Sequence, residues 1–228
     1  MTEPNLRLLG QRGHADEPSR LEESGPERVA SGPMKGRVTT GNDGRTRCWW
    51  CGDDSEYVRY HDEEWGRPLH GEAKVLEKLC LEGAQAGLSW ITILRKRDRY
   101  REVFAHFDPP TVASYTNADV ERLLTDAGIV RNRGKIESAI GNAQATVAML
   151  DRGESLDALC WSFQPPMSGN PRSSDDELVT VCPESVALSK ELKRRGFRFV
   201  GPTTMYAFMQ SAGLINDHSD GCWVQHRL

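Results

Sequence analysis

From residue 71 onward, apolar side chains recur at spacings of three and four, a pattern typical of amphipathic helices. Within residues 71–90, four positions share one such stripe: Val75, Leu76, Leu79 and Gly83. Comparable patterns predict four more helices, over residues 117–128, 134–150, 183–196 and 202–213. No stretch shows the strict alternation of a half-buried strand, so we predict an all-α fold in one domain.

The ends of these predicted helices carry capping residues. Asn117 is suited to N-cap the helix that follows it, and Gly128 is suited to end that helix. Pro202 suits the first turn of the last helix, because the N–H that proline lacks would be unpaired there. Residues 164–183 are rich in Pro, Ser and Asp, and we expect them to form a long loop.

The first 46 residues contain no Phe, Trp or Tyr and are rich in Gly, Pro, Glu, Arg and Ser. A segment of this composition buries too little apolar surface to offset the entropy of ordering. All six Trp lie after residue 48. We therefore predict a disordered extension over residues 1–46 and a folded domain over residues 47–228, with the fold beginning near Arg45.

The chain shows no apolar leader and no long apolar run. We therefore expect neither secretion nor a membrane span, and a reducing, cytoplasmic location. In such a compartment, six cysteines favour metal ligands or buried thiols over a disulfide framework.

The net charge of −4 does not by itself indicate nucleic-acid binding, but basic residues gather in three clusters. The clusters are residues 95–101, 131–135 and 193–198. Each could be a solvated helix end, since Lys and Arg suit C-terminal turns. Together they could form a phosphate-binding face, if the fold brings them to one side.

Residues 48–51 read C-W-W-C, which fits half of a zinc site, a redox pair or chance. Structural zinc takes four ligands, usually Cys and His, in a tetrahedral arrangement. Candidate ligands lie near both ends of the predicted domain: Cys48, Cys51, His61, His218 and Cys222. A zinc ion there would join the two ends and act structurally. The alternative is a free thiol pair with unrelated histidines.

Two catalytic interpretations of these motifs are weaker. The H-x-E at residues 61–63 opens the signature of zinc nucleotide deaminases, but the P-C-x-x-C that must follow is absent. A redox C-x-x-C needs a βαβ context, which an all-α chain does not supply.

Glu82 lies on the apolar stripe of the first predicted helix, three residues after Leu79 and seven after Val75. An unpaired carboxylate in such a position is costly. It could be a helix-end glutamate that reaches water or an arginine. Nearby aromatic residues favour another role, because a carboxylate among rings suits a flat, cationic, hydrogen-bonding ligand. These aromatics are Trp49, Trp50, Tyr57, Tyr60, Trp65 and Trp90.

Four long segments and the final Cys222 then follow in order from Arg47. The segments are RCWWCGDDSEYVRYHDEEWG, LCLEGAQAGLSWITIL, DAGIVRNRGKIESAIGNA and KRRGFRFVGPTTMYAFMQSAGLINDH. In sequence and spacing they resemble the 3-methyladenine DNA glycosylase I family, over essentially the whole predicted domain. The resemblance implies a helix-hairpin-helix DNA glycosylase fold, a structural zinc site joining the two ends of the domain, and removal of N3-methyladenine from alkylated DNA.

The resemblance also implies roles for individual residues. One structural zinc ion per chain would be held by Cys48, His61, His218 and Cys222. The base pocket would be formed by Trp50, Tyr57, Tyr60, Trp65, Glu82 and Trp90, with Glu82 as the catalytic residue. Cys51 matches no ligand of the family and could compete with Cys48 for zinc.

DNA contacts are expected from two places. The hairpin corresponds to residues 194–204, where the second helix would point free backbone N–H groups at a phosphate. The contacts expected there are Arg195, Gly196, Arg198, Gly201 and Thr203. The loop at residues 86–89 would fill the gap left by a flipped nucleotide, through Gly87 and Leu88.

We therefore expect a monomeric base-excision repair enzyme that acts on double-stranded DNA containing alkylated bases. No lysine is placed as a Schiff-base nucleophile, so we expect hydrolysis of the N-glycosidic bond without strand cleavage. Asp217 neighbours the expected ligand His218, and we give it no catalytic role. The competing interpretation is a non-enzymatic zinc protein that binds DNA or a cationic small molecule through the same pocket.

Overall fold

The structure is a computed structural model that describes residues 38–166 and 179–227. These residues belong to the second of two units of the chain, Lys35–Leu228, and the first unit, Met1–Met34, lies outside them. The disorder expected for residues 1–37 therefore concerns residues that the structure does not describe. The same holds for residues 167–178 of the expected long loop.

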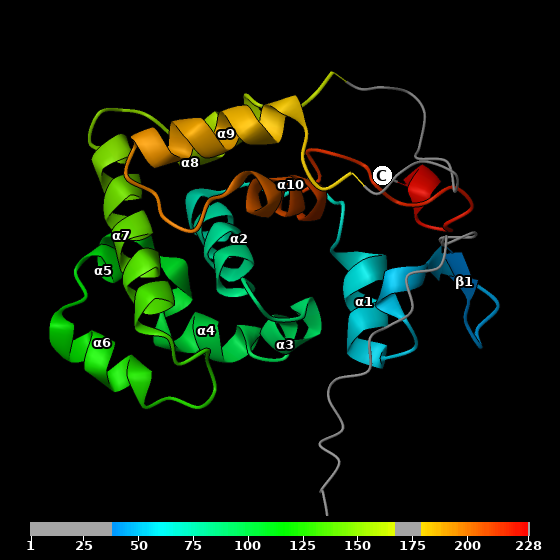
Figure 1. Cartoon of the computed structure of the whole chain (residues 1–228), viewed down its shortest axis with the longest axis horizontal. Coiled ribbons are helices and arrows are strands. Elements are labelled where there is room, and N and C mark those ends of the chain that lie inside the picture. Colours follow the sequence, from blue (N-terminus) through cyan, green and yellow to red (C-terminus); the bar gives the residue numbers. More distant parts are fainter. Residues whose placement is uncertain (1–37, 167–178, 228) are drawn as a thin grey trace, which may run out of the picture. The chain divides into compact units, whose positions relative to one another are not determined.

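Helices dominate the described part of the chain (Figure 1). The α-helices are α1 (Ser55–Glu63), α2 (Glu72–Ala84), α3 (Trp90–Leu94), α4 (Arg97–Val103), α5 (Pro109–Ala113), α6 (Asn117–Leu124), α7 (Arg133–Leu150), α8 (Leu156–Trp161), α9 (Pro183–Arg194) and α10 (Pro202–Ser211). Short 3-10 helices lie at Trp49–Cys51, Ala105–Phe107 and Gln225–Arg227. All five predicted helices are present, as α2, α6, α7, α9 and α10, so the mostly helical class is confirmed. Within the described ranges, no helix is both long and apolar enough to cross a membrane.

Helix α2 lies at the centre of the packing, against α7, α8 and α10 (Figure 1). Its predicted stripe is buried: Val75 and Leu76 are fully inaccessible and Leu79 is 1% exposed. Gly83 continues the stripe where another segment comes close. A Cβ atom at this position would lie 2.9 Å from the Cβ of Phe199, so a larger residue would push that segment away.

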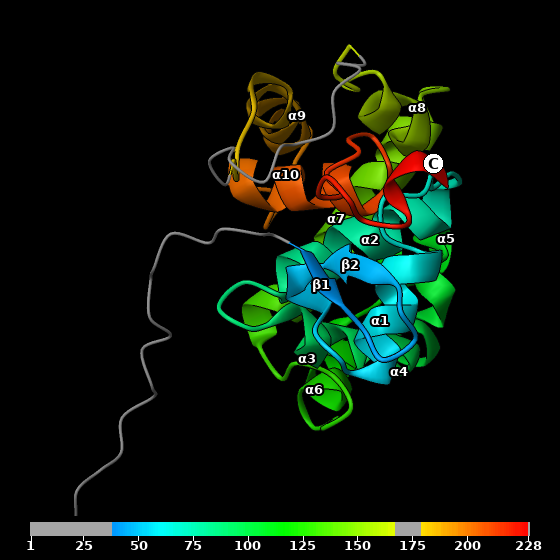
Figure 2. The same ribbon diagram turned by 90° about the vertical axis from the view of Figure 1, so that its right-hand side faces the viewer.

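The fold begins earlier than residue 47, with a small β-hairpin. Strand β1 (Val38–Thr40) pairs antiparallel with β2 (Thr46–Cys48), and Figure 2 shows the hairpin beside α1. The expectations of a boundary near Arg45 and of no strands were therefore wrong. Three-residue strands are too short to show alternation, and polar contacts hold this hairpin. Arg47 is 5% exposed and donates to both Asp43 and Asp62.

The start of α6 also differs by one residue from the prediction. Thr116, not Asn117, is the extended N-cap residue, and its backbone N–H donates to Asp119 Oδ2 at 2.9 Å. Asp119 three residues later completes the interaction, which makes Thr116 the better cap. The helix ends with Thr125 as its C-cap, before Gly128. At α10 the prediction is confirmed, since Pro202 occupies the first turn and Gly201 is the N-cap.

Helices α9 and α10 pack together and are joined by the turn at residues 195–201. Gly196 has φ of +93° and Phe199 has φ of +57°, so the turn contains two left-handed residues. The side chain of Asn142 on α7 fixes this turn through two hydrogen bonds to the backbone of Arg198. Its Oδ1 accepts from the Arg198 backbone N–H at 2.8 Å, and its Nδ2 donates to the Arg198 carbonyl at 3.2 Å.

Replacing Asn142 tests how far this clamp stabilises the fold. Asn142→Ala leaves the Arg198 N–H and carbonyl without partners, so we expect the free energy of unfolding to fall by about 1–3 kcal/mol. Urea denaturation monitored by circular dichroism gives the value. Lys190→Ala, at an exposed position of α9, is the matched control and should change stability by less than about 0.5 kcal/mol. If both variants were equally stable, the hydrogen bonds of Asn142 to Arg198 would not stabilise the fold.

Candidate active site and metal centre

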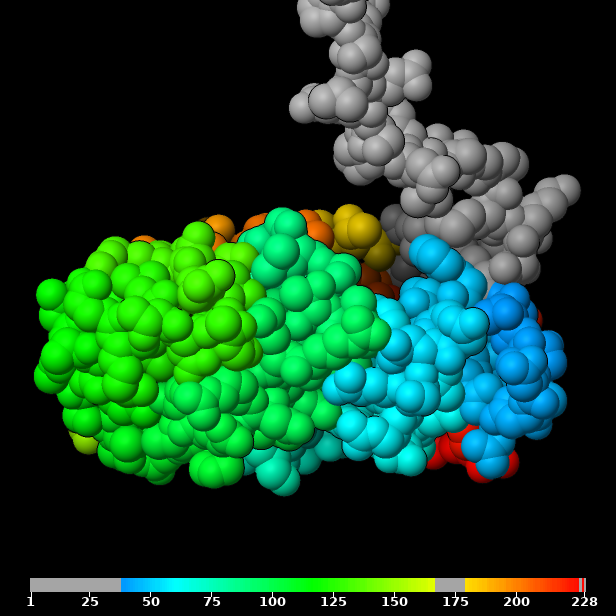
Figure 3. Space-filling model, turned by 90° about the horizontal axis from the view of Figure 1, so that it is seen from below, coloured from blue at the N-terminus to red at the C-terminus, as the bar shows by residue number. Residues whose placement is uncertain are grey.

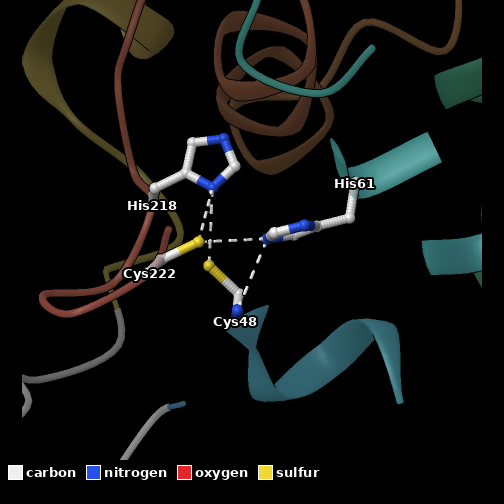
Figure 4. Close-up of side chains that lie close together, drawn as sticks. All are labelled: Cys48, His61, His218 and Cys222. Atoms are coloured by element: carbon white, nitrogen blue, oxygen red, sulfur yellow. Dashed lines mark hydrogen bonds between the residues drawn. The ribbon is translucent and has the colours of Figure 1, made fainter. Parts of the chain in front are cut away.

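Four side chains from the two ends of the described chain meet at one buried point: Cys48, His61, His218 and Cys222 (Figure 4). Their ligand atoms all lie within 4.8 Å of one another. The Cys222 Sγ is 3.4 Å from His61 Nε2 and 3.5 Å from His218 Nδ1. The Cys48 Sγ is 3.6 Å from His218 Nδ1. The fold therefore brings together all four of the residues that were expected to bind metal.

This donor set fits a structural zinc site. With Zn–S distances of about 2.3 Å and Zn–N distances of about 2.0–2.1 Å, tetrahedral zinc sets each S···N separation at about 3.6 Å. The three measured S···N distances lie within 0.2 Å of that value. The hydrogen bond with Cys48, followed by those with His218 and His61, lowers the pKa of Cys222, which favours the thiolate that zinc binds.

Outer contacts orient both histidines. His61 Nδ1 lies 2.8 Å from Asp62 Oδ1, so the other ring nitrogen, Nε2, faces the sulfurs. Asp62 is held in turn by Arg47 Nη2 at 2.8 Å and by Trp223 Nε1 at 3.0 Å. His218 Nε2 lies 3.2 Å from the carbonyl of Trp65. Partners of this kind fix the ring tautomer and orientation of metal-binding histidines.

The two cysteines of C-W-W-C face different ways. Cys51 does not belong to the four-residue cluster, and its Sγ donates to the carbonyl of Cys48 at 3.2 Å. Burial raises the pKa of Cys51 to about 11, which keeps it a thiol. Among the described residues, Cys48 therefore supplies the only sulfur of this motif that faces the cluster.

A pocket of about 230 Å³ lies beside the metal cluster. All six residues expected to form a base pocket line it: Trp50, Tyr57, Tyr60, Trp65, Glu82 and Trp90. They come from the segment around α1, from α2 and from the start of α3. Figure 3 shows the surface hollowed between atoms of α1 in cyan and those of α2 and α3 in green, with α10 in orange behind.

The aromatic rings of the pocket pack mostly edge to face. Trp50 lies 5.1 Å from Tyr57 and 4.9 Å from Trp65, measured between ring centroids, and Tyr60 lies 5.5 Å from Trp90. Trp65 also joins the pocket to the metal cluster, because its ring lies 4.6 Å from that of His218. Such tilted arrangements leave ring faces available for stacking on a flat ligand.

Glu82 is the buried carboxylate of the pocket, and it does not escape to water or to an arginine. It is 5% exposed, and Ser211 of α10 donates a hydrogen bond to its Oε1 at 2.8 Å. Burial raises the pKa of Glu82, while the Lys78 ammonium and the Ser211 hydrogen bond oppose that shift. The remaining acceptor capacity of Glu82 is available to N–H groups of a ligand.

The loop between α2 and α3 lies next to this pocket. Gly87 has φ of +78°, and Leu88 is 41% exposed. Lys135 of α7 holds the base of the loop, since its Nζ donates to the carbonyls of Ala84 and Ala86, each at 2.7 Å. Leu88 is thus an exposed apolar side chain on an anchored loop, between the pocket residues Glu82 and Trp90.

Many of the basic residues considered for a phosphate-binding face are paired with carboxylates. In cluster 95–101, every arginine pairs with a carboxylate: Arg95 with Asp54, Arg97 with Glu64, Arg99 with Asp126 and Glu102, and Arg101 with Glu77. Arg195 is likewise held by Glu154 and Glu191, with 14% of its side chain exposed. The DNA contact expected from Arg195 stays a prediction, and the Arg195 guanidinium would have to exchange its two carboxylate partners for a phosphate.

Among the residues that the structure describes, three exposed cations in or near the turn between α9 and α10 form no ion pair with a carboxylate. They are Arg131 before α7, Lys193 at the end of α9 and Arg198 in the turn. Phe199 brings these segments together, because a Cβ atom at Gly83 or at Gly134 would contact its side chain. Gly196 lies in the same turn, and Gly201 and Thr203 lie at the N-terminus of α10.

Comparison with known proteins identifies the family. The model of the methyladenine glycosylase family matches residues 50–226. The chain belongs to this family. DNA-3-methyladenine glycosylase 1 of Escherichia coli (strain K12) is 51% identical over 179 residues, which cover 77% of this chain and 95% of that protein.

Solved structures agree with the family assignment. A crystal structure of 3-methyladenine DNA glycosylase I has a TM-score of 0.72 and 50% identity, and the match covers 78% of this chain and 98% of that one. A tyrosine-to-phenylalanine variant of 3-methyladenine DNA glycosylase I in complex with 3-methyladenine has a TM-score of 0.70 and 36% identity, with 78% and 97% covered. The fold of this methyladenine glycosylase is therefore that of 3-methyladenine DNA glycosylase I.

Several residues that line this glycosylase's pocket were not indicated by the sequence. They are Gln85, Val179, Ala207, Gln210, Asp217 and Ser219, while Trp49, one of the aromatics close to Glu82 in the sequence, lines it as well. Gln85 could have been found, because it lies three residues after Glu82, on the same face of α2. Gln210 and Asp217 come from the far end of the chain, and only the tertiary fold brings them to Glu82. Asp217 Oδ2 accepts from Gln210 Nε2 at 2.7 Å and from Tyr206 at 2.6 Å.

Separate serine substitutions test which sulfur binds metal. Cys48→Ser removes one of four donors, so we expect the purified protein to lose its zinc, from about one ion per chain to a small fraction. Cys51→Ser is the matched control and should keep the metal, because its sulfur faces the carbonyl of Cys48. Metal analysis of both purified variants decides the question. Retention by Cys48→Ser together with loss by Cys51→Ser would show that the ligand is the other sulfur.

Proposed function

We propose that this methyladenine glycosylase hydrolyses the N-glycosidic bond of N3-methyladenine in alkylated double-stranded DNA and leaves an abasic site. The observation that carries the proposal is the pocket, in which the buried carboxylate of Glu82 lies among six aromatic residues. The family and the relatives named above support the same activity.

The chemistry of the lesion matches the pocket. N3-methyladenine carries a positive charge in DNA, so its glycosidic bond is already weak and the base leaves as a neutral molecule. The enzyme therefore has to extract the nucleotide, hold the base and admit water to the sugar C1′ atom. Aromatic faces attract a cationic ring, and a carboxylate accepts its N–H groups, so the pocket prefers the alkylated base over neutral adenine.

Glu82 is the residue to which we assign this selectivity and catalysis. Its carboxylate would accept hydrogen bonds from the adenine edge while Tyr60, Trp90 and Trp65 line the space around the base. Negative charge close to the sugar also stabilises an oxocarbenium-like transition state. None of the pocket-lining residues within the described ranges is a lysine, which is consistent with hydrolysis without strand cleavage.

The DNA would be held beside this pocket by the turn between α9 and α10. The first turn of α10 has free backbone N–H groups, including that of Thr203, and such groups bind phosphate. Arg198 lies in the same turn and forms no ion pair with a carboxylate of the described residues. Leu88 would occupy the gap left by the extracted nucleotide, since it is an exposed apolar side chain on an anchored loop next to the pocket.

We assign the metal cluster a structural role. Four protein ligands complete the coordination of zinc and leave no position for water, which a catalytic zinc requires. When bound, the ion would join residues 48–61 to residues 218–222 and so hold the Trp65 wall of the pocket. This role explains why ligands and pocket residues alternate along the same segments.

One experiment separates this enzyme from the competing interpretation of a non-enzymatic DNA-binding or ligand-binding zinc protein. The full chain is incubated with methylated duplex DNA, free bases are separated by chromatography, and abasic sites are revealed by heat and alkali. Release of 3-methyladenine without strand cleavage before alkali treatment supports the proposal. Binding of the DNA without base release would overturn it.

Glu82→Gln tests the assigned residue within the same assay. Glutamine keeps the shape but removes the charge, and a hydrogen bond to a charged group contributes about 1.5–3 kcal/mol. We therefore expect single-turnover release of 3-methyladenine to slow by about 10- to 100-fold, with the fold retained by circular dichroism. Unchanged release would rule out a catalytic role for Glu82.

Arg198→Ala tests the proposed phosphate contact. Each neutralised phosphate contributes about 0.9 to the slope of log affinity against log salt concentration. We expect Arg198→Ala to weaken binding to undamaged duplex DNA and to reduce that slope by about 0.9. Arg194→Ala is the matched control, because Arg194 is exposed but paired with Glu191. If the salt-dependence slopes of the two variants were equal, Arg198 would not contact a DNA phosphate.

A further inference from the structure

A buried lysine lies directly behind the proposed pocket. Lys78 is 8% exposed and lies on α2, one turn before Glu82. Its Nζ is 5.1 Å from the ring centroid of Tyr60 and 5.2 Å from that of Trp90. The same atom donates to the Tyr60 hydroxyl oxygen at 3.4 Å. Burial lowers the pKa of Lys78, and the Glu82 carboxylate is the largest of the effects that oppose this shift and favour the ammonium.

Among the residues that the structure describes, the cations around Lys78 have carboxylate partners, whereas Lys78 forms no ion pair. Arg97 of α4 pairs with Glu64 at the end of α1, at 2.5 Å. Glu77, the neighbour of Lys78 on α2, pairs with Arg101 at 2.8 Å. Within the described residues, Lys78 makes no ion pair closer than 4.0 Å. Its ammonium therefore acts mainly on Glu82, four residues later on the same face of α2, and each of the two charges shifts the pKa of the other.

The other titratable groups around Glu82 do not replace this cation. From α1 come Tyr57, Tyr60 and Glu64, from α4 comes Arg97, and from the segment after α10 comes Asp217. Tyr57 and Tyr60 are neutral phenols, because burial raises the pKa of each above its usual value. The remaining contact from α10 is the neutral Ser211 hydroxyl.

We propose that Lys78 is a positioning residue that keeps Glu82 a carboxylate at neutral pH and leaves the Tyr60 hydroxyl hydrogen free for the bound base. The inference rests on the proposed function and adds a residue that the pocket lining does not include. Because Lys78 donates to the Tyr60 oxygen, Tyr60 can use its own hydrogen toward an acceptor nitrogen of the base. The pocket then offers one anionic acceptor and one donor to the purine edge.

The effect of pH follows from the signs of these interactions. Burial raises the pKa of Glu82, and the Lys78 ammonium is the larger of the two effects that oppose the rise. Removing the ammonium therefore raises that pKa further, so Glu82 becomes protonated at a higher pH. A protonated Glu82 no longer attracts a cationic base. The loss is confined to acidic and neutral pH, because at alkaline pH Glu82 is ionised with or without Lys78.

The experiment is the pH profile of single-turnover 3-methyladenine release from methylated duplex DNA by the full chain. For Lys78→Met we expect the acidic limb to move to higher pH by about one unit, with release at alkaline pH equal to that of the wild type or faster. Lys78→Arg, which keeps the cation, should restore the limb. Lys74→Met, at an exposed position one turn earlier on α2, should leave the profile unchanged.

Lys78→Gln serves as a second neutral variant, should methionine prevent folding. Quenching of tryptophan fluorescence by free 3-methyladenine across the same pH range provides a binding readout that needs no catalysis. The free base is neutral, but its N–H groups still need the ionised Glu82 carboxylate as their acceptor, so the same shift of the acidic limb is expected in this binding assay. Absence of base release by the wild type would refute the proposed function, and the binding limb would still test Lys78. An unshifted limb, or a uniform loss at every pH that Lys78→Arg does not restore, would overturn the inference.

Discussion

The pocket depends on one tertiary contact, the meeting of Cys48 and His61 with His218 and Cys222. Trp65 follows His61 by one turn, places its ring in the pocket, and binds His218 through its carbonyl. Asp217 and Ser219, which flank His218, line the other side. Both walls are therefore fixed by the same four side chains. An ion at this point closes a loop of nearly the whole domain, which is where a cross-link restricts the unfolded chain most.

A second constraint is the cost of burying the charge of Glu82. A carboxylate with 5% exposure has lost most of its hydration. The hydrogen bond from Ser211 and the positive charge of Lys78 compensate only part of the free energy that this loss costs. This deficit destabilises the fold but favours function. A cationic base that enters the pocket supplies the missing partner, so binding energy is largest for the ligand whose charge is opposite to that of the site.

The sequence predicted the helices well because their apolar faces repeat over several turns, and α2 and α7 are the clearest cases. It also showed Glu82 as an acid on an apolar stripe, and the resemblance to the family suggested the four Cys and His residues. It could not show partners that are distant along the chain. The β-hairpin depends on Arg47 reaching Asp62, and Arg195 is occupied by Glu154. The sequence around Lys78 does not distinguish it from an exposed helical lysine, because the side chains that bury it, Tyr60 and Trp90, belong to α1 and α3.

The distribution of paired arginines is compatible with the proposed DNA contact at one place on a chain with a net charge of −4. All four arginines of the 95–101 cluster pair with carboxylates, so their positive charge is cancelled locally. Within the described part of the chain, Arg131, Lys193 and Arg198 form no ion pair with a carboxylate, and Lys193 and Arg198 lie at the turn between α9 and α10. Few phosphate contacts give weak, salt-sensitive binding to undamaged DNA. Discrimination must therefore come from the pocket, where Glu82 and the rings act only on a base that has left the stack.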